Sequence, residues 1–143
     1  MDQAKPGDIV FFDFSGGKRK TEHVGIVKAV SAICSRFCEG GSRGVIPRDG
    51  HSACKRVCMF LRWMVRDGSP VDLGLWAGKI PKTSLIMPLD THVLTEAGKL
   101  GLLSSRCASM SAARRLTAAL AEVFPGDPLR GDFALFGYGV SQE

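Results

Sequence analysis

The sequence predicts a mainly α-helical domain preceded by an N-terminal β-hairpin, and three observations lead to this fold class. Within residues 1–30, two β-branched and aromatic runs flank a Gly-Gly turn, which is typical of a hairpin. Residues 31–47 are rich in glycine and lack periodicity, so they predict a linker. From about residue 48 to 143 apolar residues recur at helical spacing between Gly and Pro signals, so this part predicts a helical domain.

The hairpin is expected from an apolar run over 8–14, a turn over 15–20 and a second apolar run over 23–30. The first helix is expected over 52–66, with Ser52 as its N-cap. Its apolar face is predicted to carry Val57, Phe60, Leu61 and Met64.

A basic stripe lies on the same predicted helix, formed by Lys55, Arg62 and Arg66, with Arg56 beside it. Two interpretations stay open for this stripe. It is either a solvated helix face or a face that contacts phosphates, because guanidinium groups match phosphate oxygens geometrically.

The turn over 67–70 ends the first helix, and residues 71–87 predict a packed loop with at most a short helix. Asp90 follows Pro88 and stands at the N-cap of a helix over 91–100, which Gly101 ends. A third helix is expected from Ser109 or Ser111 to Phe124, where a Pro-Gly-Asp-Pro turn stops it. Residues 132–140 predict the start of a further helix.

Composition limits the function classes. Hydrophobic residues make up 45% and charged residues 23%, as in ordinary globular proteins. The net charge of +5 permits nucleic acid as a partner without requiring it. The chain has no apolar run near 18 residues and no signal peptide, so we expect a cytoplasmic protein without membrane association. No cofactor and no obligate protein partner are predicted.

The five cysteines are an odd number without an export signal, which argues against a disulfide framework. Two Cys-x3-Cys pairs permit a four-thiolate zinc site, but the same spacing is typical of cysteines on a buried helix face. The buried interpretation is preferred, and no metal is predicted. The four residues concerned are Cys34, Cys38, Cys54 and Cys58.

Lys55 and Asp90 form the candidate catalytic pair. An amine can attack an electrophilic carbon covalently, while a fixed carboxylate stabilises positive charge that develops beside it. The alternative for Asp90 is a simple helix cap, and the two roles are compatible because a cap is both fixed and exposed.

From about Val45 to Val140 the chain resembles a bacterial family related to the helix-hairpin-helix DNA glycosylases. The resemblance rests on ordered blocks, notably 50–56, 59–66, 71–76, 88–93, 99–102 and 132–137. The Leu-Asp-Thr-His-Val block at 89–93 also looks like the catalytic-aspartate block of endonuclease III-type glycosylases. Lys55 precedes Asp90 by 35 positions, a spacing similar to that in archaeal 8-oxoguanine glycosylases.

The resemblance implies a partial helix-hairpin-helix glycosylase-like domain that excises a damaged base from duplex DNA and cleaves the strand through a lysine Schiff base. Lys55 and Asp90 would be catalytic, and Arg56, Arg62 and Arg66 would contact the DNA backbone. His92 is expected to pack or lie at the surface. The sequence departs from the glycosylase pattern in two ways. Glu96 puts a negative charge near the expected DNA surface. The related proteins are also longer, so the domain is predicted to be truncated and its activity stays open.

The N-terminal segment points to another class. Residues 5–13 and 23–27 resemble the second half of cysteine peptidase domains that cleave peptidoglycan, of the CHAP and NlpC type. The resemblance implies that His23 is a catalytic base, but no cysteine precedes it in the sequence. The alternative hypothesis is therefore a non-catalytic composite or fragment that carries a peptidase-like hairpin.

Overall fold

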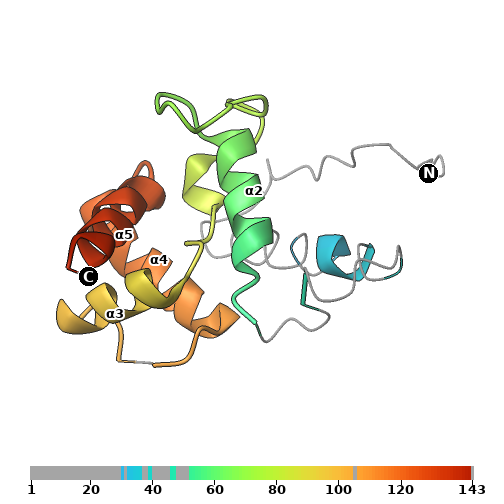
Figure 1. Ribbon diagram of the computed structural model, residues 1–143. Helices are drawn as coiled ribbons and strands as arrows, with labels where there is room; N and C mark the ends of the chain where they lie inside the picture. Colours follow the sequence, from blue (N-terminus) through green and yellow to red (C-terminus); the bar gives the residue numbers. More distant parts are fainter. Residues whose placement is uncertain are drawn as a thin grey trace, which may run out of the picture.

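The computed structural model describes residues 30, 32–36, 39, 46–47, 52–104 and 106–142. Within these ranges the protein is helical and has no strand, only one isolated antiparallel bridge between Ser52 and Ser109. The mainly α prediction is confirmed (Figure 1). The predicted hairpin, except for Val30, and His23 lie outside the described residues.

Residues 32–36 and 39 are helical. This part of the chain therefore differs from the linker without periodicity that the sequence predicted. Val30 and Cys34 are buried in the main hydrophobic core, and Ile33 packs against it. These three residues lie at i, i+3 and i+4, which places them on one helix face. The glycine content of the whole stretch concealed this short apolar pattern.

Helix α2 spans Lys55–Val65 and begins later than predicted. Ser52 is not its N-cap; Cys54 holds that position in the left-handed region, with φ 47° and ψ 42°. The buried face also differs from the prediction, since Phe60 is 43% exposed. The buried residues of α2 are Val57, Cys58, Leu61, Arg62 and Val65.

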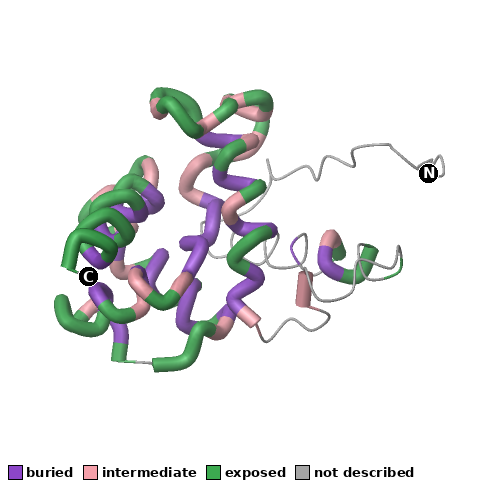
Figure 2. The backbone as a smooth tube through the Cα atoms, in the orientation of Figure 1, coloured by how far each residue is buried: buried purple, intermediate pink, exposed green. Residues whose placement is uncertain are grey.

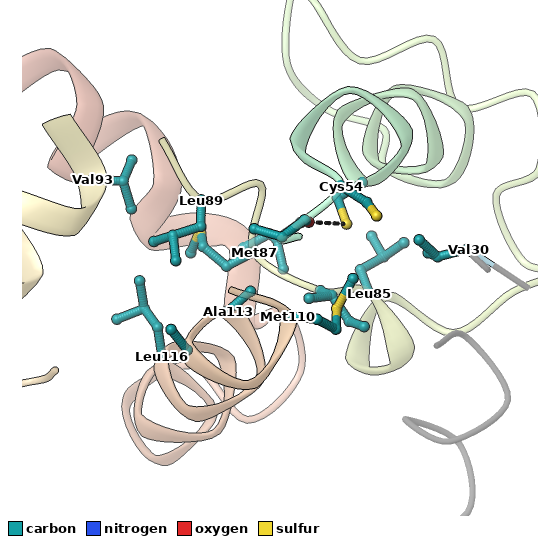
Figure 3. Close-up of a cluster of buried hydrophobic side chains, with 14 of the residues drawn as sticks. Val30, Cys54, Leu85, Met87, Leu89, Val93, Met110, Ala113 and Leu116 are labelled. Carbon is teal, nitrogen blue, oxygen red and sulfur yellow. Dashed lines mark hydrogen bonds between the residues drawn. The ribbon is translucent and has the colours of Figure 1, made fainter. Parts of the chain in front are cut away.

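After α2 the chain makes several turns and a short 3-10 helix, η1 (Lys82–Ser84). The residues 85–89 then run through the centre of the protein, and all five are buried. The backbone N–H of Met87 donates to the hydroxyl of Thr117 at 2.9 Å. Figure 3 shows the side chains of this segment packed against those of helix α4, including Met110, Ala113 and Leu116.

Helix α3 spans Thr91–Lys99 and α4 spans Met110–Val123. Asp90 caps α3 through its side chain, as predicted, and Ser109 caps α4 in the same way, which agrees with the earlier of the two predicted starts of that helix. Gly101 follows α3 with φ 71°, a conformation that favours glycine at a helix end.

The chain ends in a 3-10 turn, η2 (Pro128–Gly131), and helix α5 (Asp132–Ser141), which packs along α3 (Figure 1). Buried residues gather where α2, α4 and the 85–89 segment meet, while the outer helix faces are exposed (Figure 2). Among the described residues, no helix combines the length and the apolar character needed to cross a membrane.

Candidate active site

Lys55 and Asp90, 35 positions apart in the sequence, meet in the structure. The Lys55 Nζ donates to Asp90 Oδ2 at 3.0 Å. The lysine side chain is 46% exposed and the aspartate side chain 10%. The pair therefore lies at a surface opening with the carboxylate on the inner side, where a substrate group can reach the amine.

The position of Asp90 is fixed by the helix that it caps. Its Oδ1 accepts a hydrogen bond from the backbone N–H of Val93 at 2.8 Å, which leaves Oδ2 for Lys55. A carboxylate at a helix N-terminus is also stabilised by the partial positive charge there. The buried segment 85–89 leads directly into this cap.

Lys55 is the first residue of α2, directly after the left-handed Cys54. Cys54 is the only non-glycine residue with positive φ among those described. Such a conformation costs energy and persists only where its surroundings enforce it. The carbonyl of Cys54 accepts the N–H groups of Val57 and Cys58, and its own side chain is buried, so the turn that presents Lys55 is held firmly.

Lys55 and Asp90 line a cleft of about 230 Å³ between α2, the residues before α3, and α5. Aromatic side chains form much of its wall: Trp63 from α2, and Phe133 and Phe136 from α5. All three rings are also partly exposed. The arrangement places the Lys55 amino group and two carboxylates beside the flat apolar faces of aromatic rings.

Asp132 is a second carboxylate in the cleft, which the sequence did not reveal as a site residue. Its carboxylate accepts from Arg62 Nη1 at 2.9 Å and is nearly fully buried. Burial, opposed by Arg62 and reinforced by the negative charge of Asp90, raises the pKa of Asp132 from 3.8 to about 6. The sequence signal for Asp132 is its place as the one charged residue at the start of an otherwise uncharged helix.

Arg62 and Arg66, which the sequence analysis assigned to DNA contacts, do not lie on the surface of this structure. Both are buried, at 1% and 7% exposure. Arg62 pairs with Asp132 and Asp72, and Arg66 pairs with Asp72 and Asp127. Buried guanidinium groups need such partners because removing a charge from water is costly.

This network supports one wall of the cleft. The Arg62 guanidinium also lies over the ring of Phe133, 4.0 Å from the ring centre. Arg62 therefore holds both the carboxylate of Asp132 and a neighbouring aromatic ring in place. Of the three predicted DNA-contacting arginines, only Arg56 is exposed.

Glu96 is likewise not where the sequence suggested. It is buried at 3% exposure and accepts from Lys99 Nζ at 2.7 Å. The expected negative charge on this side of α3 is therefore screened by the lysine.

One family model matches the chain over residues 9–141, which is 133 of 143 residues, and the family is described as "Protein of unknown function (DUF2400)". The chain belongs to the DUF2400 family. No curated protein and no solved structure matches the chain. The DUF2400 match continues through residues 9–30, so one family covers both the predicted hairpin segment and the helical domain.

In this DUF2400 protein three of the four described cysteines are core residues, and the fourth, Cys107, is exposed. Cys34, Cys54 and Cys58 are buried, and burial raises the pKa of Cys58 to about 12. The described part of the chain contains no group of three or more His, Cys, Asp or Glu residues arranged to hold a metal ion. Cys38 lies outside the described residues.

His92 packs edge-on against Phe136 of α5, with 5.7 Å between ring centres. It is partly buried and belongs to the α3–α5 contact, as the sequence predicted for a packing residue. Because Phe136 lines the cleft, this contact also fixes part of the cleft wall.

Proposed function

We propose that this protein is a base-excision DNA glycosylase with AP-lyase activity, built on a partial helix-hairpin-helix glycosylase-like domain. The observation that carries the proposal is the 3.0 Å hydrogen bond between Lys55 Nζ and Asp90 Oδ2 at the mouth of an aromatic-lined cleft. Damaged duplex DNA is the proposed partner, with the target nucleotide flipped into the cleft.

In the proposed reaction Lys55 first transfers a proton from its ammonium group to Asp90. The neutral amine then attacks C1′ of the target sugar, and the C1′–N bond to the base breaks as the base leaves with its electron pair and gains a proton. The departing base takes its proton from Asp90, and the regenerated carboxylate stabilises the positive charge that develops on the sugar. Ring opening gives a Schiff base between Lys55 and C1′, and loss of the C2′ proton then expels the 3′ phosphate.

The cleft walls suit this chemistry. Trp63, Phe133 and Phe136 offer apolar faces on which a base removed from the helical stack can pack. The exposed Lys55 is accessible to a nucleotide, while the capped Asp90 keeps a fixed orientation. Fixed charges beside a forming cation stabilise the transition state without reorganisation.

Borohydride trapping tests the proposal. The full chain is incubated with a duplex containing one abasic site, and separately with a duplex containing 8-oxoguanine, in the presence of borohydride. We expect a covalent protein–DNA adduct that is lost in Lys55→Ala and retained in Lys79→Ala, a change at an exposed lysine outside the cleft.

Absence of an adduct from the unaltered protein, or an adduct that persists in Lys55→Ala, contradicts the proposal. Absence of any adduct would favour the alternative hypothesis, a non-catalytic protein carrying a peptidoglycan-peptidase-like segment around His23, whereas an adduct that persists in Lys55→Ala would assign the reaction to another amine. Peptide mapping of the adduct gives an independent check, because the modified residue must be Lys55.

A further inference from the structure

The positive charge available to a nucleic acid lies on a different part of the surface from that expected. Because Arg62 and Arg66 are buried in ion pairs, α2 exposes little positive charge beyond that of Lys55 and Arg56. The residues 96–122, by contrast, contain four basic side chains and two acidic ones, Glu96 and Glu122, a local charge of +2. All four are exposed: Lys99, Arg106, Arg114 and Arg115.

Two of these basic residues flank a groove between the C-terminal half of α3 and the segment that follows it. The groove encloses about 620 Å³ and is lined by Lys99 and Arg106 together with the hydroxyl-bearing Thr95 and Ser104. None of the described residues lining it is acidic. Cationic and hydroxyl groups at an open groove can donate hydrogen bonds to phosphate oxygens.

The Glu96–Lys99 pair is close to neutral overall but exposes its positive end at this groove. The carboxylate side chain is 5% exposed, whereas the lysine side chain is 57% exposed. The ammonium group therefore faces solvent and the carboxylate faces the interior. Glu96, which the sequence placed near the expected DNA surface, accepts a hydrogen bond from Lys99 and is itself turned away from the groove.

Helix α3 connects the groove to the cleft. Asp90 at its N-cap lines the cleft, and Lys99 at its last turn lines the groove. Nine residues at about 1.5 Å each span roughly 13–14 Å. This length corresponds to about four base pairs along a duplex axis.

The face of α3 between the two sites is smooth and uncharged. Thr91, Thr95 and Gly98 lie at i, i+4 and i+7 and are all exposed. A Cβ added to Gly98 would meet only the carbonyl oxygen of Leu103, at 3.7 Å. A polyanionic strand can therefore approach this face closely without meeting a negative side chain.

We propose that the exposed face of α3 and the groove between Lys99 and Arg106 bind the phosphate backbone of duplex DNA about four base pairs from the nucleotide in the cleft. This inference rests on the proposed function, since it assigns the substrate's backbone to a second site on the same protein. Double-stranded DNA is favoured over a small anion because the basic residues and the smooth helix face extend over a length greater than one phosphate.

Binding is measured by fluorescence anisotropy with a labelled duplex that carries one abasic site, over a series of salt concentrations. For Arg106→Ala combined with Lys99→Gln we expect at least tenfold weaker binding. The slope of log affinity against log salt should fall by about 2, because each lost phosphate contact removes roughly 0.9 from it.

A second variant avoids disturbing the Glu96–Lys99 pair. Gly98→Glu places a carboxylate in the groove where space allows it, and glutamate favours a helix more than glycine does. Its matched control is Gly126→Glu, which makes the same charge change at an exposed glycine with nothing within 4 Å of an added Cβ. We expect Gly98→Glu to weaken binding at least tenfold and Gly126→Glu to change it less than twofold.

The outcome separates this inference from the proposed function. If unaltered protein forms the Lys55 adduct but Gly98→Glu and the double variant bind DNA normally, the groove is not a DNA site and the inference is overturned. If both variants bind weakly while no Lys55 adduct ever forms, the groove stands and the glycosylase proposal fails. If the unaltered protein does not bind the duplex at all, both are overturned.

Discussion

Lys55 and Asp90 are joined through a single oxygen of the Asp90 carboxylate, because the other oxygen caps helix α3. Oδ2 accepts from Lys55 Nζ at 3.0 Å and Oδ1 from the backbone N–H of Val93 at 2.8 Å. The catalytic and capping interpretations of Asp90 are therefore compatible in geometry. The two roles can be separated by mutation.

Asp90→Asn should preserve the cap and remove the charge, whereas Asp90→Ala should remove both. Asparagine caps helices about as well as aspartate, so we expect Asp90→Asn to leave the free energy of unfolding nearly unchanged. Asp90→Ala should lower it by about 1 kcal/mol, within a range of about 0.5–2 kcal/mol. Urea unfolding at neutral pH measures both values.

The same two variants should behave alike in catalysis. Both lack the negative charge beside Lys55, so the rate of borohydride trapping should fall by roughly 10²-fold or more in each. If Asp90→Asn traps DNA as fast as the unaltered protein, Asp90 is a helix cap and nothing more.

The elements of this site differ in how far the sequence could predict them. Asp90 was predictable because N-cap preference is local and Pro88 marks the preceding break. The burial of Arg62 and Arg66 was not, since it depends on acids far along the chain: Asp132 lies 70 residues from Arg62, and Asp127 lies 61 from Arg66. Periodicity reports which residues share a helix face but not which distant charges meet that face.

The buried face of α2 illustrates the same limit. Helical spacing allowed Phe60 and Met64 on the apolar face, but Cys58, Arg62 and Val65 belong to the face that is buried. Because the basic residue Arg62 lies in the middle of the buried face, the apolar pattern assigned that face to neighbouring positions. From α2 onward the helices were located to within a few residues because Gly, Pro and capping residues mark most of their ends, whereas the helical residues at 32–36 and 39 were missed.

Thr117 should stabilise the segment that leads to the active site. Its buried hydroxyl accepts from Met87 N–H at 2.9 Å and donates to the Ala113 carbonyl at 2.7 Å. Thr117→Val keeps the size but leaves the Met87 N–H without a partner, so we expect a loss of about 1–3 kcal/mol in unfolding free energy. Thr95→Val is the matched control at an exposed helix position and should change stability by less than about 0.5 kcal/mol.

Asp132 should make stability depend on pH in a direction opposite to that of most aspartates. Because burial raises its pKa from 3.8 to about 6, the folded protein retains a proton between these values that the unfolded chain releases. The stabilisation is complete below pH 3.8 and is lost as the pH rises through 6. The full effect is about 3 kcal/mol.

The measurement is the difference in unfolding free energy between the unaltered protein and Asp132→Asn from pH 4 to pH 7. Asparagine cannot titrate, so effects of other carboxylates largely cancel, and the difference should fall as the pH rises from about 4 and level off just above 6. Carbon-13 titration of the Asp132 carboxyl provides a direct check. A flat difference, or a carboxyl that titrates near 4, contradicts the prediction.

Gly139 should be required for the contact between α3 and α5 that brings Phe133 and Phe136 to the cleft. A Cβ at this position would lie 2.9 Å from the Cβ of His92 and 3.3 Å from the Cγ of Glu96, so the two helices would have to separate. We expect Gly139→Ala to lower the unfolding free energy by about 1–3 kcal/mol, the usual cost of overpacking. Gly137→Ala lies on the same helix with nothing within 4 Å of the added Cβ and should raise stability by up to about 1 kcal/mol, because alanine favours helix. Equal effects of the two changes in urea unfolding would show that helix propensity, and not the close approach of α3, governs this position.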